Sequence, residues 1–426
     1  MERPTRIAGW YACALVSVFF LLLPPRGYGW MMETKYAAFL LLTTLYLAAA
    51  LADGLVRARG GAPRKPLASP RMTAPVRCAA AYLACSAVSA LLSPYGAQTL
   101  LGGPRRDGLV TLSLCVAVFF FLARDLRPDR RLLYLAAGAA TLCDALVLAQ
   151  LTGRNPLRLY PGNWNYYDGD VSYAGFYAGT AGNIDFTAFL LALAVCVLLF
   201  ALVRLRLWTL APTAALTLYV LYRLGVAAAW VGLACALVWG LPLLFPGNRK
   251  PMAAVSAVLT LGAVVLLWRY SGENRTLAEA SALLHGEADG GFGSGRVAIW
   301  RECWELARER PLFGGGPDTL WLRGVEPLTW FRNGTATPVD ITAAHNEYLN
   351  ILANQGAFAL CAYLALLGSA LLRCFRRARE PAFALCGAGL LCYAAMAPFS
   401  ISTCITAPYV WLLLALAAQR EQFVET

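Results

Sequence analysis

NIDFTAFLLALAVCVLLFALV, residues 183–203, is the stretch that decides the fold class. It contains one charged side chain, Asp185, and it is long enough for a helix to cross the ~30 Å hydrocarbon core of a bilayer. The whole chain has the same character, because 59% of its 426 residues are hydrophobic and only 14% are charged. A soluble domain averages roughly a quarter charged residues. The sequence therefore predicts an integral membrane protein.

Similar apolar runs recur along the chain and predict an all-α polytopic membrane protein with about 12 transmembrane helices. The predicted spans are 9–24, 36–52, 78–92, 109–122, 132–150, 183–203, 207–222, 225–245, 252–268, 346–372, 382–397 and 404–418. One long polar interruption follows the ninth span. The chain is thus expected to divide into helices 1–9 (residues 1–269), a large loop (270–348), and helices 10–12 with a short tail (349–426).

Basic residues indicate which side of the membrane each segment occupies. With the N-terminus inside, 21 of the 36 Lys and Arg residues fall on the cytoplasmic side, as the positive-inside rule requires. We therefore expect both termini to be cytoplasmic and the 270–348 loop to be extracytoplasmic. The net charge of +12 reflects this bias, so it does not indicate nucleic-acid binding. The 13 cysteines lie mostly in apolar spans, where Cys acts as a small hydrophobe.

The first candidate functional segment of the long loop is RVAIWRECWELARERPLFGGGP, residues 296–317. Residues 296–309 have the period of an amphipathic helix, with an apolar face formed by Val297, Trp300, Cys303, Trp304 and Ala307. Arg296 lies at the edge of this face. Its guanidinium could bind phosphate in a bidentate manner, or it could extend to the interface as an ordinary arginine. The glycine-rich turn lacks the Lys-Ser/Thr of a nucleotide-binding loop.

The loop ends at TAAHNEYLNILANQG, residues 342–356, with one of the two histidines of the chain. We expect His345 in the first turn of the tenth span, capped by Asp340 or Thr342. The positive end of a helix dipole disfavours an imidazolium, so His345 would remain neutral and could accept a proton. The alternative is an interfacial histidine without a catalytic role. His285 has no such surroundings and is interpreted as incidental.

Other exterior segments carry further candidates. Residues 160–177 contain seven aromatic side chains, including Trp164 and Tyr166, which fit equally an interfacial belt or a platform for sugar rings. Asp168-Gly169-Asp170 is similar to a metal-binding pair, although such patterns are common. Arg105, Arg106 and Arg223 lie at exterior span ends, where they suit an anionic substrate delivered through lipid or simply extend to the interface.

These blocks resemble the O-antigen ligase and polymerase superfamily of bacterial membrane glycosyltransferases. The resemblance rests on Arg296, Trp300, Ala307, Pro311-Leu312, Gly314, Gly316 and Pro317, then on His345-Asn346-Glu347-Tyr348-Leu349 and Gly356. Gly179-Thr180-Ala181-Gly182-Asn183, Gly102–Arg106–Gly108 and Thr406-Ala407-Pro408 also look familial. The chain departs from the family at Tyr222-Arg223, where Ser-Arg is usual, and at Asp185, where asparagine is common.

The resemblance implies a GT-C-like fold in the bacterial inner membrane and transfer of a glycan from an undecaprenyl-diphosphate donor to an acceptor hydroxyl. It implies an inverting reaction without a metal or a cofactor. His345 would be the base, and Arg296 and Arg223 would hold the diphosphate. Substrate-binding residues would be Arg105, Arg106, Asn183, Asn346, Tyr348, Trp164 and Tyr166. The acceptor, and hence ligase or polymerase, stays open. The alternative is a non-enzymatic flippase or transporter of lipid-linked oligosaccharides, which predicts charges buried within spans.

Overall fold

The structure is a computed structural model that describes residues 3–59, 73–168, 175–287, 292–325, 328–332 and 335–419. A helix lies at each of the twelve predicted spans. These helices are α1 (Arg3–Ala14, continued by the π-helical turn Leu15–Phe19), α2 (Met31–Arg59), α3 (Ala74–Leu91), α5 (Leu109–Asp125), α6 (Arg130–Leu151), α7 (Ile184–Arg204), α8 (Ala211–Leu224), α9 (Ala227–Trp239), α11 (Arg249–Trp268), α14 (Glu347–Arg376), α15 (Pro381–Met396) and α16 (Ala407–Ala418). Short helices α4 (Gln98–Leu101) and α10 (Leu241–Leu244) connect them.

Length and composition support membrane crossing for part of this set. In the described chain, seven helical stretches are long and apolar enough to cross a bilayer, namely Tyr28–Val56, Ala74–Leu91, Arg130–Leu151, Ile184–Arg204, Arg249–Trp268, Glu347–Arg376 and Pro381–Phe399. Helices α8, α9 and α16 are shorter, with 14, 13 and 12 residues. The helical, polytopic character is thus confirmed, while a total of about twelve spans stays a prediction.

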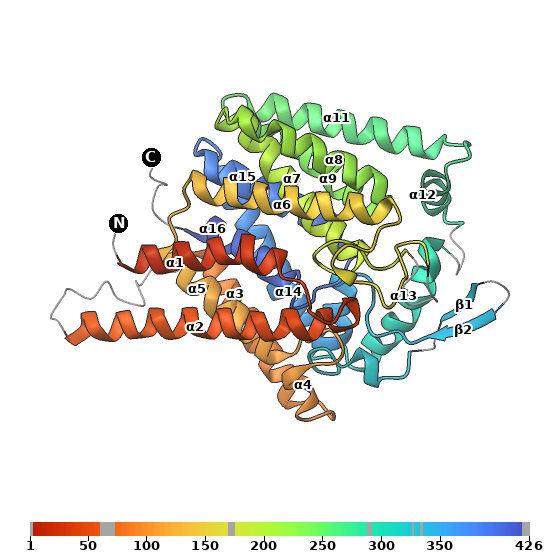
Figure 1. Ribbon diagram of the computed structural model, residues 1–426, viewed down its shortest axis with the longest axis horizontal. Helices are drawn as coiled ribbons and strands as arrows, with labels where there is room; N and C mark the ends of the chain where they lie inside the picture. The colour runs from red at the N-terminus through yellow and green to blue at the C-terminus, as the bar shows by residue number, and fades with distance from the viewer. Residues whose placement is uncertain are drawn as a thin grey trace.

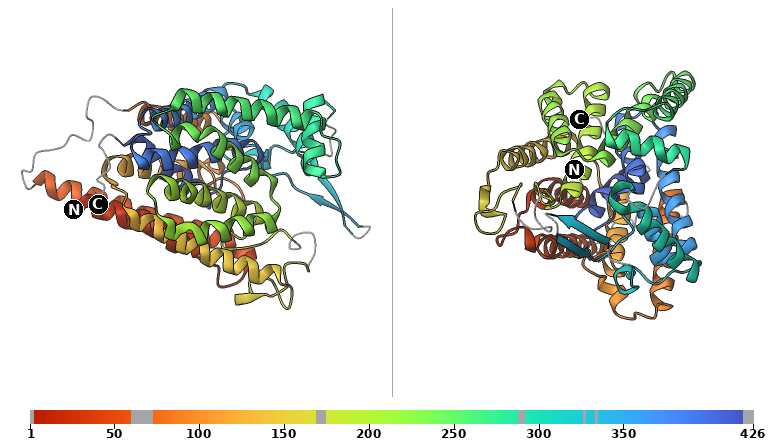
Figure 2. Two further views of the ribbon diagram at one scale, coloured as in Figure 1. Left: turned by 90° about the horizontal axis from the view of Figure 1, so that it is seen from above. Right: turned by 90° about the vertical axis from the view of Figure 1, so that its right-hand side faces the viewer.

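Successive long helices run in alternating directions, which gives the bundle two distinct ends (Figure 1). The start of α1 and the end of α16 lie at one end, which we call the terminal end. Helices α12 (Arg275–His285) and α13 (Phe292–Glu309) lie at the opposite end with the strands β1 (Leu328–Arg332) and β2 (Thr335–Val339), and we call this the loop end. Figure 2 shows the same separation from above.

Helix α7 forms the centre of the bundle, since most of its side chains are buried. Helix α15 packs against α7 and α9, and α14 packs along α3. Helix α11 lies at the outside (Figure 1), and of its side chains only Ser256 is buried. Its exposed residues from Met252 to Trp268 are almost all apolar, as expected for a helix that contacts lipid. The 13 cysteines are all free.

The large loop contains its own small core at the loop end. The residues of α13 that are buried there are Ile299, Cys303 and Ala307, which pack with Leu320, Ile341, Ala344 and Ala353. The predicted amphipathic helix is confirmed, but its predicted face is partly wrong, because Trp304 is 52% exposed. The buried face of α13 contains Ile299 in place of Trp304, because it is the face that packs on α14.

The loop also contains an antiparallel hairpin that the all-α prediction missed. Strands β1 and β2 pair from Leu328 opposite Val339 to Arg332 opposite Thr335. Both strands are rich in β-branched and aromatic residues, which favour strands. The prediction for 270–348 considered only helical periodicity.

Candidate active site

His345 lies at the loop end, immediately before α14. Its backbone φ is +49°, a left-handed conformation that is costly for a residue with a side chain and that occurs at functional sites. Asn346 is the N-cap of α14, and its side chain accepts a hydrogen bond from Leu349 N at 3.1 Å. The expected position in the first helical turn, capped by Asp340 or Thr342, was therefore wrong. The tight turn before the cap places His345 just outside the helix.

The imidazole of His345 is kept neutral by its surroundings. Burial, followed by the positive charges of Arg296 and Arg105, lowers the pKa of His345 from 6.5 to about 4. The predicted neutral state is thus supported, with burial and two arginines as the causes. These arginines come from α13 and from the loop before α5, so the fold brings together three segments far apart in the sequence.

Arg105 is held in place by Asp318, which joins the 102–108 loop to the segment that follows the glycine-rich turn. The Arg105 side chain is 5% exposed, and its Nη2 lies 3.4 Å from Asp318 Oδ1. Asp318 Oδ2 accepts hydrogen bonds from Gly103 N at 2.8 Å and from Asp107 N at 3.1 Å. A Cβ at Gly102 would lie 2.5 Å from the Asp318 carboxylate, so this approach requires glycine. One carboxylate thus holds the 102–108 loop against the glycine-rich turn.

Several donors at this end have no hydrogen-bond partner within the described residues. They are Nε and Nη1 of Arg105, the indole Nε1 of Trp300 and Nδ2 of Asn354, all of them buried. Trp300 lies one turn after Arg296 on α13, and its ring centroid is 6.3 Å from that of Phe399. Buried donors are normally paired, so these unpaired N–H groups at the loop end are suited to an oxygen-rich ligand.

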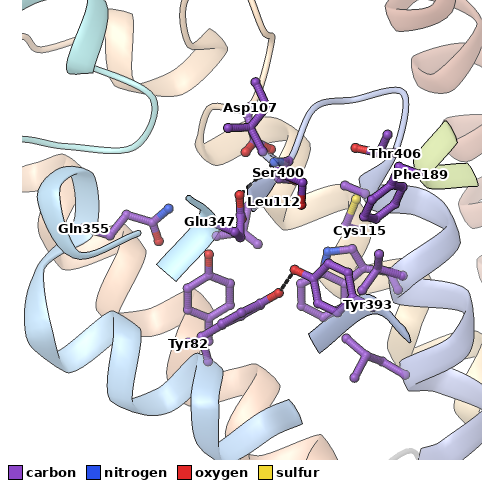
Figure 3. A pocket seen from close by; sticks show the side chains of 17 residues that line it. Tyr82, Asp107, Leu112, Cys115, Phe189, Glu347, Gln355, Tyr393, Ser400 and Thr406 are labelled. Atoms are coloured by element: carbon purple, nitrogen blue, oxygen red, sulfur yellow. Dashed lines mark hydrogen bonds between the residues drawn. The ribbon is translucent and has the colours of Figure 1, made fainter. Parts of the chain in front are cut away.

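A pocket next to this region is lined by two carboxylates, Asp107 and Glu347 (Figure 3). Glu347 Oε2 accepts a hydrogen bond from Ser402 N at 2.7 Å. Burial, and then the charges of Glu347 and Asp318, raise the pKa of Asp107 well above its ordinary value. The hydroxyl groups of Tyr363 and Tyr393 are hydrogen-bonded to each other at the pocket. The sequence placed Glu347 near His345 and Asp107 beside Arg105 and Arg106, but it did not predict that they share a pocket, because only folding brings the two carboxylates together.

The glycine-rich turn fits a break in α14. Gly356 has φ +83° and ψ 179° inside the helix, and a Cβ there would lie 2.3 Å from the Leu312 backbone. Peptide groups released by the break pair with the turn: Gly316 N donates to Asn354 O at 2.6 Å, and Ala357 N donates to Pro311 O at 2.8 Å. The turn therefore has a structural role. It anchors the loop on the helix that follows His345.

Arg223 lies at the loop end but is separate from these contacts. Its side chain is exposed at the end of α8, and Nη1 donates to Tyr219 Oη at 3.0 Å. Its guanidinium lies 5.9 Å from the Tyr219 ring centroid and is within electrostatic range of Tyr167. Its described contacts therefore join Arg223 to the aromatic segment, whereas Arg105 and Arg296 are the arginines that act on His345.

The aromatic segment divides into two parts. Tyr160 is buried and donates a hydrogen bond to Tyr177 O, and both rings pack on Tyr28 at centroid distances of 5.2 and 5.7 Å. These side chains belong to the core, so they are not a sugar platform. Tyr166 packs edge-on against Tyr167, which is 57% exposed. Trp164 and Tyr166 are partly buried, and Tyr173 lies outside the described residues.

The remaining substrate-binding candidates have structural contacts. Asn183 caps α7 by accepting hydrogen bonds from Asp185 N and Phe186 N. Tyr348 donates to Ala394 O at 3.0 Å. Arg106 has a left-handed backbone (φ +55°), and its guanidinium lies 5.7 Å from the Tyr36 ring centroid. His285 stacks on Trp268 with ring centroids 4.1 Å apart.

No group of three or more His, Cys, Asp or Glu side chains in the described ranges has the arrangement to hold a metal ion. Gly169 and Asp170 of the acidic motif lie outside those ranges.

Comparison with known proteins gives the family. Residues 212–364 match the family model described as O-Antigen ligase. The chain carries an O-antigen ligase domain. This match confirms the resemblance to the O-antigen ligase and polymerase superfamily that the loop motifs indicated. A search of curated proteins found no match.

The O-antigen ligase domain begins in α8 and ends in α14. It therefore contains Arg223, Arg296 and His345, together with the glycine-rich turn and the helix break at Gly356. Arg105 lies outside the matched segment and reaches His345 only through the fold. Of the two arginines that act on His345, Arg296 therefore belongs to the domain, and Arg105 comes from the loop before α5.

Proposed function

We propose that the protein is a membrane glycosyltransferase that transfers or polymerises a glycan from an undecaprenyl-diphosphate donor onto an acceptor hydroxyl. The observation that carries this proposal is the convergence of a neutral histidine and two buried or half-buried arginines at the loop end of an O-antigen ligase domain. A base and a diphosphate-binding site are the two requirements of this transfer. The outer face of the bacterial inner membrane is the proposed location of this end.

In the proposed reaction, the acceptor oxygen attacks the anomeric carbon and the bond from that carbon to the diphosphate breaks. His345 takes the hydroxyl proton, and the electron pair of the broken bond leaves with the diphosphate. Arg296 and Arg105 stabilise the added negative charge, since guanidinium groups bind phosphate oxygens directly. A single displacement of this kind inverts the anomeric carbon, and the arginines provide the positive charge that a metal supplies elsewhere.

Donor binding would also strengthen the base. A pKa of about 4 makes His345 neutral but weakly basic. Because the positive charges of Arg296 and Arg105 contribute to that low value, a bound diphosphate would offset them and raise the pKa of His345. The base would therefore become effective when the donor is present.

Arg223 would act with the aromatic segment. Its exposed guanidinium beside Tyr219 and Tyr167 suits the approach of an anionic, sugar-bearing substrate. Trp164 and Tyr166 lie in the same segment as Tyr167 and are proposed sugar contacts. Arg106, Asn183, Asn346 and Tyr348 remain proposed substrate-site residues that also position the surrounding elements.

Transport of a lipid-linked oligosaccharide is the second candidate, because it predicts charges buried within helices. Lys35 of α2 and Asp144 of α6 are such charges. Lys35 Nζ donates to Phe19 O at 2.5 Å and Phe20 O at 3.0 Å, and Asp144 accepts from Thr217 Oγ1 at 2.6 Å. Lys35 is bound by two carbonyl groups and Asp144 by one hydroxyl group, while Asp144 Oδ1 has no partner among the described residues. Within these residues neither charge has an oppositely charged partner that would form a translocation path, so we favour a structural role for both and retain the transferase.

A glycan-elongation assay with a lipid-linked donor tests the proposal. We expect His345→Ala to abolish elongation and His285→Ala to retain it, because only His345 lies beside the arginines. Arg296→Lys and Arg105→Lys should each reduce activity, since lysine keeps the charge but loses the bidentate geometry, and Arg223→Lys should weaken the approach of the donor. Equal activity of the two histidine variants would reject His345 as the base. Full activity of Arg296→Lys combined with Arg105→Lys would reject the diphosphate assignment, and full activity of Arg223→Lys would reject its role in donor approach.

A further inference from the structure

A second recess lies away from the active site, between the π-helical turn after α1 and the helices α6, α7, α15 and α16. Its walls are mainly apolar, with Phe20, Leu133, Val197, Leu385 and Leu413 among the lining residues. Along α7 it extends from Leu190 to Arg204, which corresponds to about 21 Å at the helical rise of 1.5 Å per residue. A groove of that length exceeds one leaflet of a ~30 Å hydrocarbon core, so it can hold an acyl chain.

The mouth of this groove at the terminal end is basic. Arg130, Arg204, Arg206 and Arg379 line it. Arg204 is bound to carbonyl oxygens of Ala378 and Arg379, whereas Arg130, Arg206 and Arg379 have no carboxylate partner among the described residues. Arg206 also has a left-handed backbone, with φ +56°, a conformation that arginine adopts only at a cost.

The two acids at the mouth, Asp129 and Glu380, offset only part of the charge of its four arginines. Asp129 caps α6 by accepting a hydrogen bond from Arg131 N at 3.0 Å, and Glu380 forms an ion pair with Arg377 at 2.6 Å. Arg377 is not among the lining residues. The mouth therefore presents three arginines to whatever enters the groove.

We infer that this groove binds an anionic phospholipid, with its phosphate at Arg130, Arg206 and Arg379 and an acyl chain between α6, α7 and α16. Guanidinium groups favour phosphate, and basic recesses between membrane helices bind anionic headgroups. The basic mouth of the groove is at the terminal end, whereas α13 and the hairpin lie at the loop end of the bundle (Figure 1). The lipid phosphate is therefore not the donor diphosphate of the reaction, and the inference stands independently of the proposed function.

Native mass spectrometry of the delipidated full chain tests the inference. The protein is titrated with phosphatidylglycerol or with phosphatidylcholine that has identical acyl chains. We expect tighter binding of phosphatidylglycerol, and a loss of about fivefold in affinity for each arginine replaced by glutamine, or roughly a hundredfold for all three. The matched control carries Arg6→Gln, Arg77→Gln and Lys250→Gln, which remove three exposed charges at the same end outside the groove.

A second pair of variants tests the acyl-chain position. Ala194→Trp fills the groove wall and should reduce phosphatidylglycerol binding, whereas Ala254→Trp on the exposed face of α11 should not. Equal affinity for the two lipids, or equal losses in the arginine and control triples, would overturn the inference. Unchanged binding in Ala194→Trp would place the lipid elsewhere. Displacement of phosphatidylglycerol by an equimolar polyprenyl phosphate would show that the spent carrier, not a phospholipid, is the occupant.

Discussion

The titration of His345 is the prediction on which the proposed chemistry depends most directly. Its pKa of about 4, against an ordinary 6.5, corresponds to about 3 kcal/mol against the protonated form at 1.36 kcal/mol per unit. Replacing Arg296 by glutamine removes one positive neighbour while keeping a polar side chain of similar length. The pKa of His345 should rise in this variant but remain below 6.5, because burial is the larger cause.

Histidine hydrogen–deuterium exchange, read by mass spectrometry of peptides, measures this pKa directly. The exchange rate at the imidazole C2 position depends on protonation, and the two histidines of the chain lie in separable peptides. Arg308→Gln is the matched control, because Arg308 is an exposed residue of the same helix that pairs with Glu305. A wild-type value at or above 6.5, or the same value in Arg296→Gln and wild type, would refute the electrostatic argument.

The same shift predicts how acid affects stability. The unfolded chain binds a proton at His345 near pH 6.5, whereas the folded protein does so only near pH 4. Between these values the unfolded state holds more protons, so stability falls as pH falls. Thermal unfolding from pH 7 to pH 4 should show a steeper loss in wild type than in His345→Gln, by up to about 3 kcal/mol. Parallel losses in the two proteins would contradict this assignment.

Three further predictions concern other parts of the chain. Gly356→Ala should lower the thermal midpoint sharply and expose the loop to protease, because a Cβ there would lie 2.3 Å from the Leu312 backbone; an unchanged midpoint would contradict the packing of the break. Asp144→Asn should retain elongation activity, since its contact is with Thr217; abolished glycan translocation in vesicles would favour the transporter instead. Tyr167→Ala should raise the KM for the donor without lowering the thermal midpoint, as its ring is 57% exposed, and the reverse pattern would assign it to the core.

Much of the fold could be predicted because membrane helices leave a local signal. A helix was found at every predicted span, and α13 was recognised from its period. The hairpin 328–339 was missed because only helical periodicity was considered in the polar loop, and two five-residue strands give a weak alternating pattern. For the site, the sequence singled out His345 and Arg296, but it placed His345 inside the helix. The left-handed turn at that residue depends on how the loop returns to α14.

What the sequence by itself determined is the membrane class, the helix positions and the histidine–arginine pair of the O-antigen ligase domain. The class and the helix positions depend on residues close together in the chain, because hydrocarbon requires every backbone group to be satisfied within its own helix. The histidine and the arginine were each proposed from a local motif, at either end of the loop. Only the tertiary structure decided that Arg105 reaches His345, that Asp318 clasps two loops, and that Asp107 shares a pocket with Glu347. Those contacts join segments more than 200 residues apart. Their geometry is set by the packing of the bundle, which no local pattern encodes.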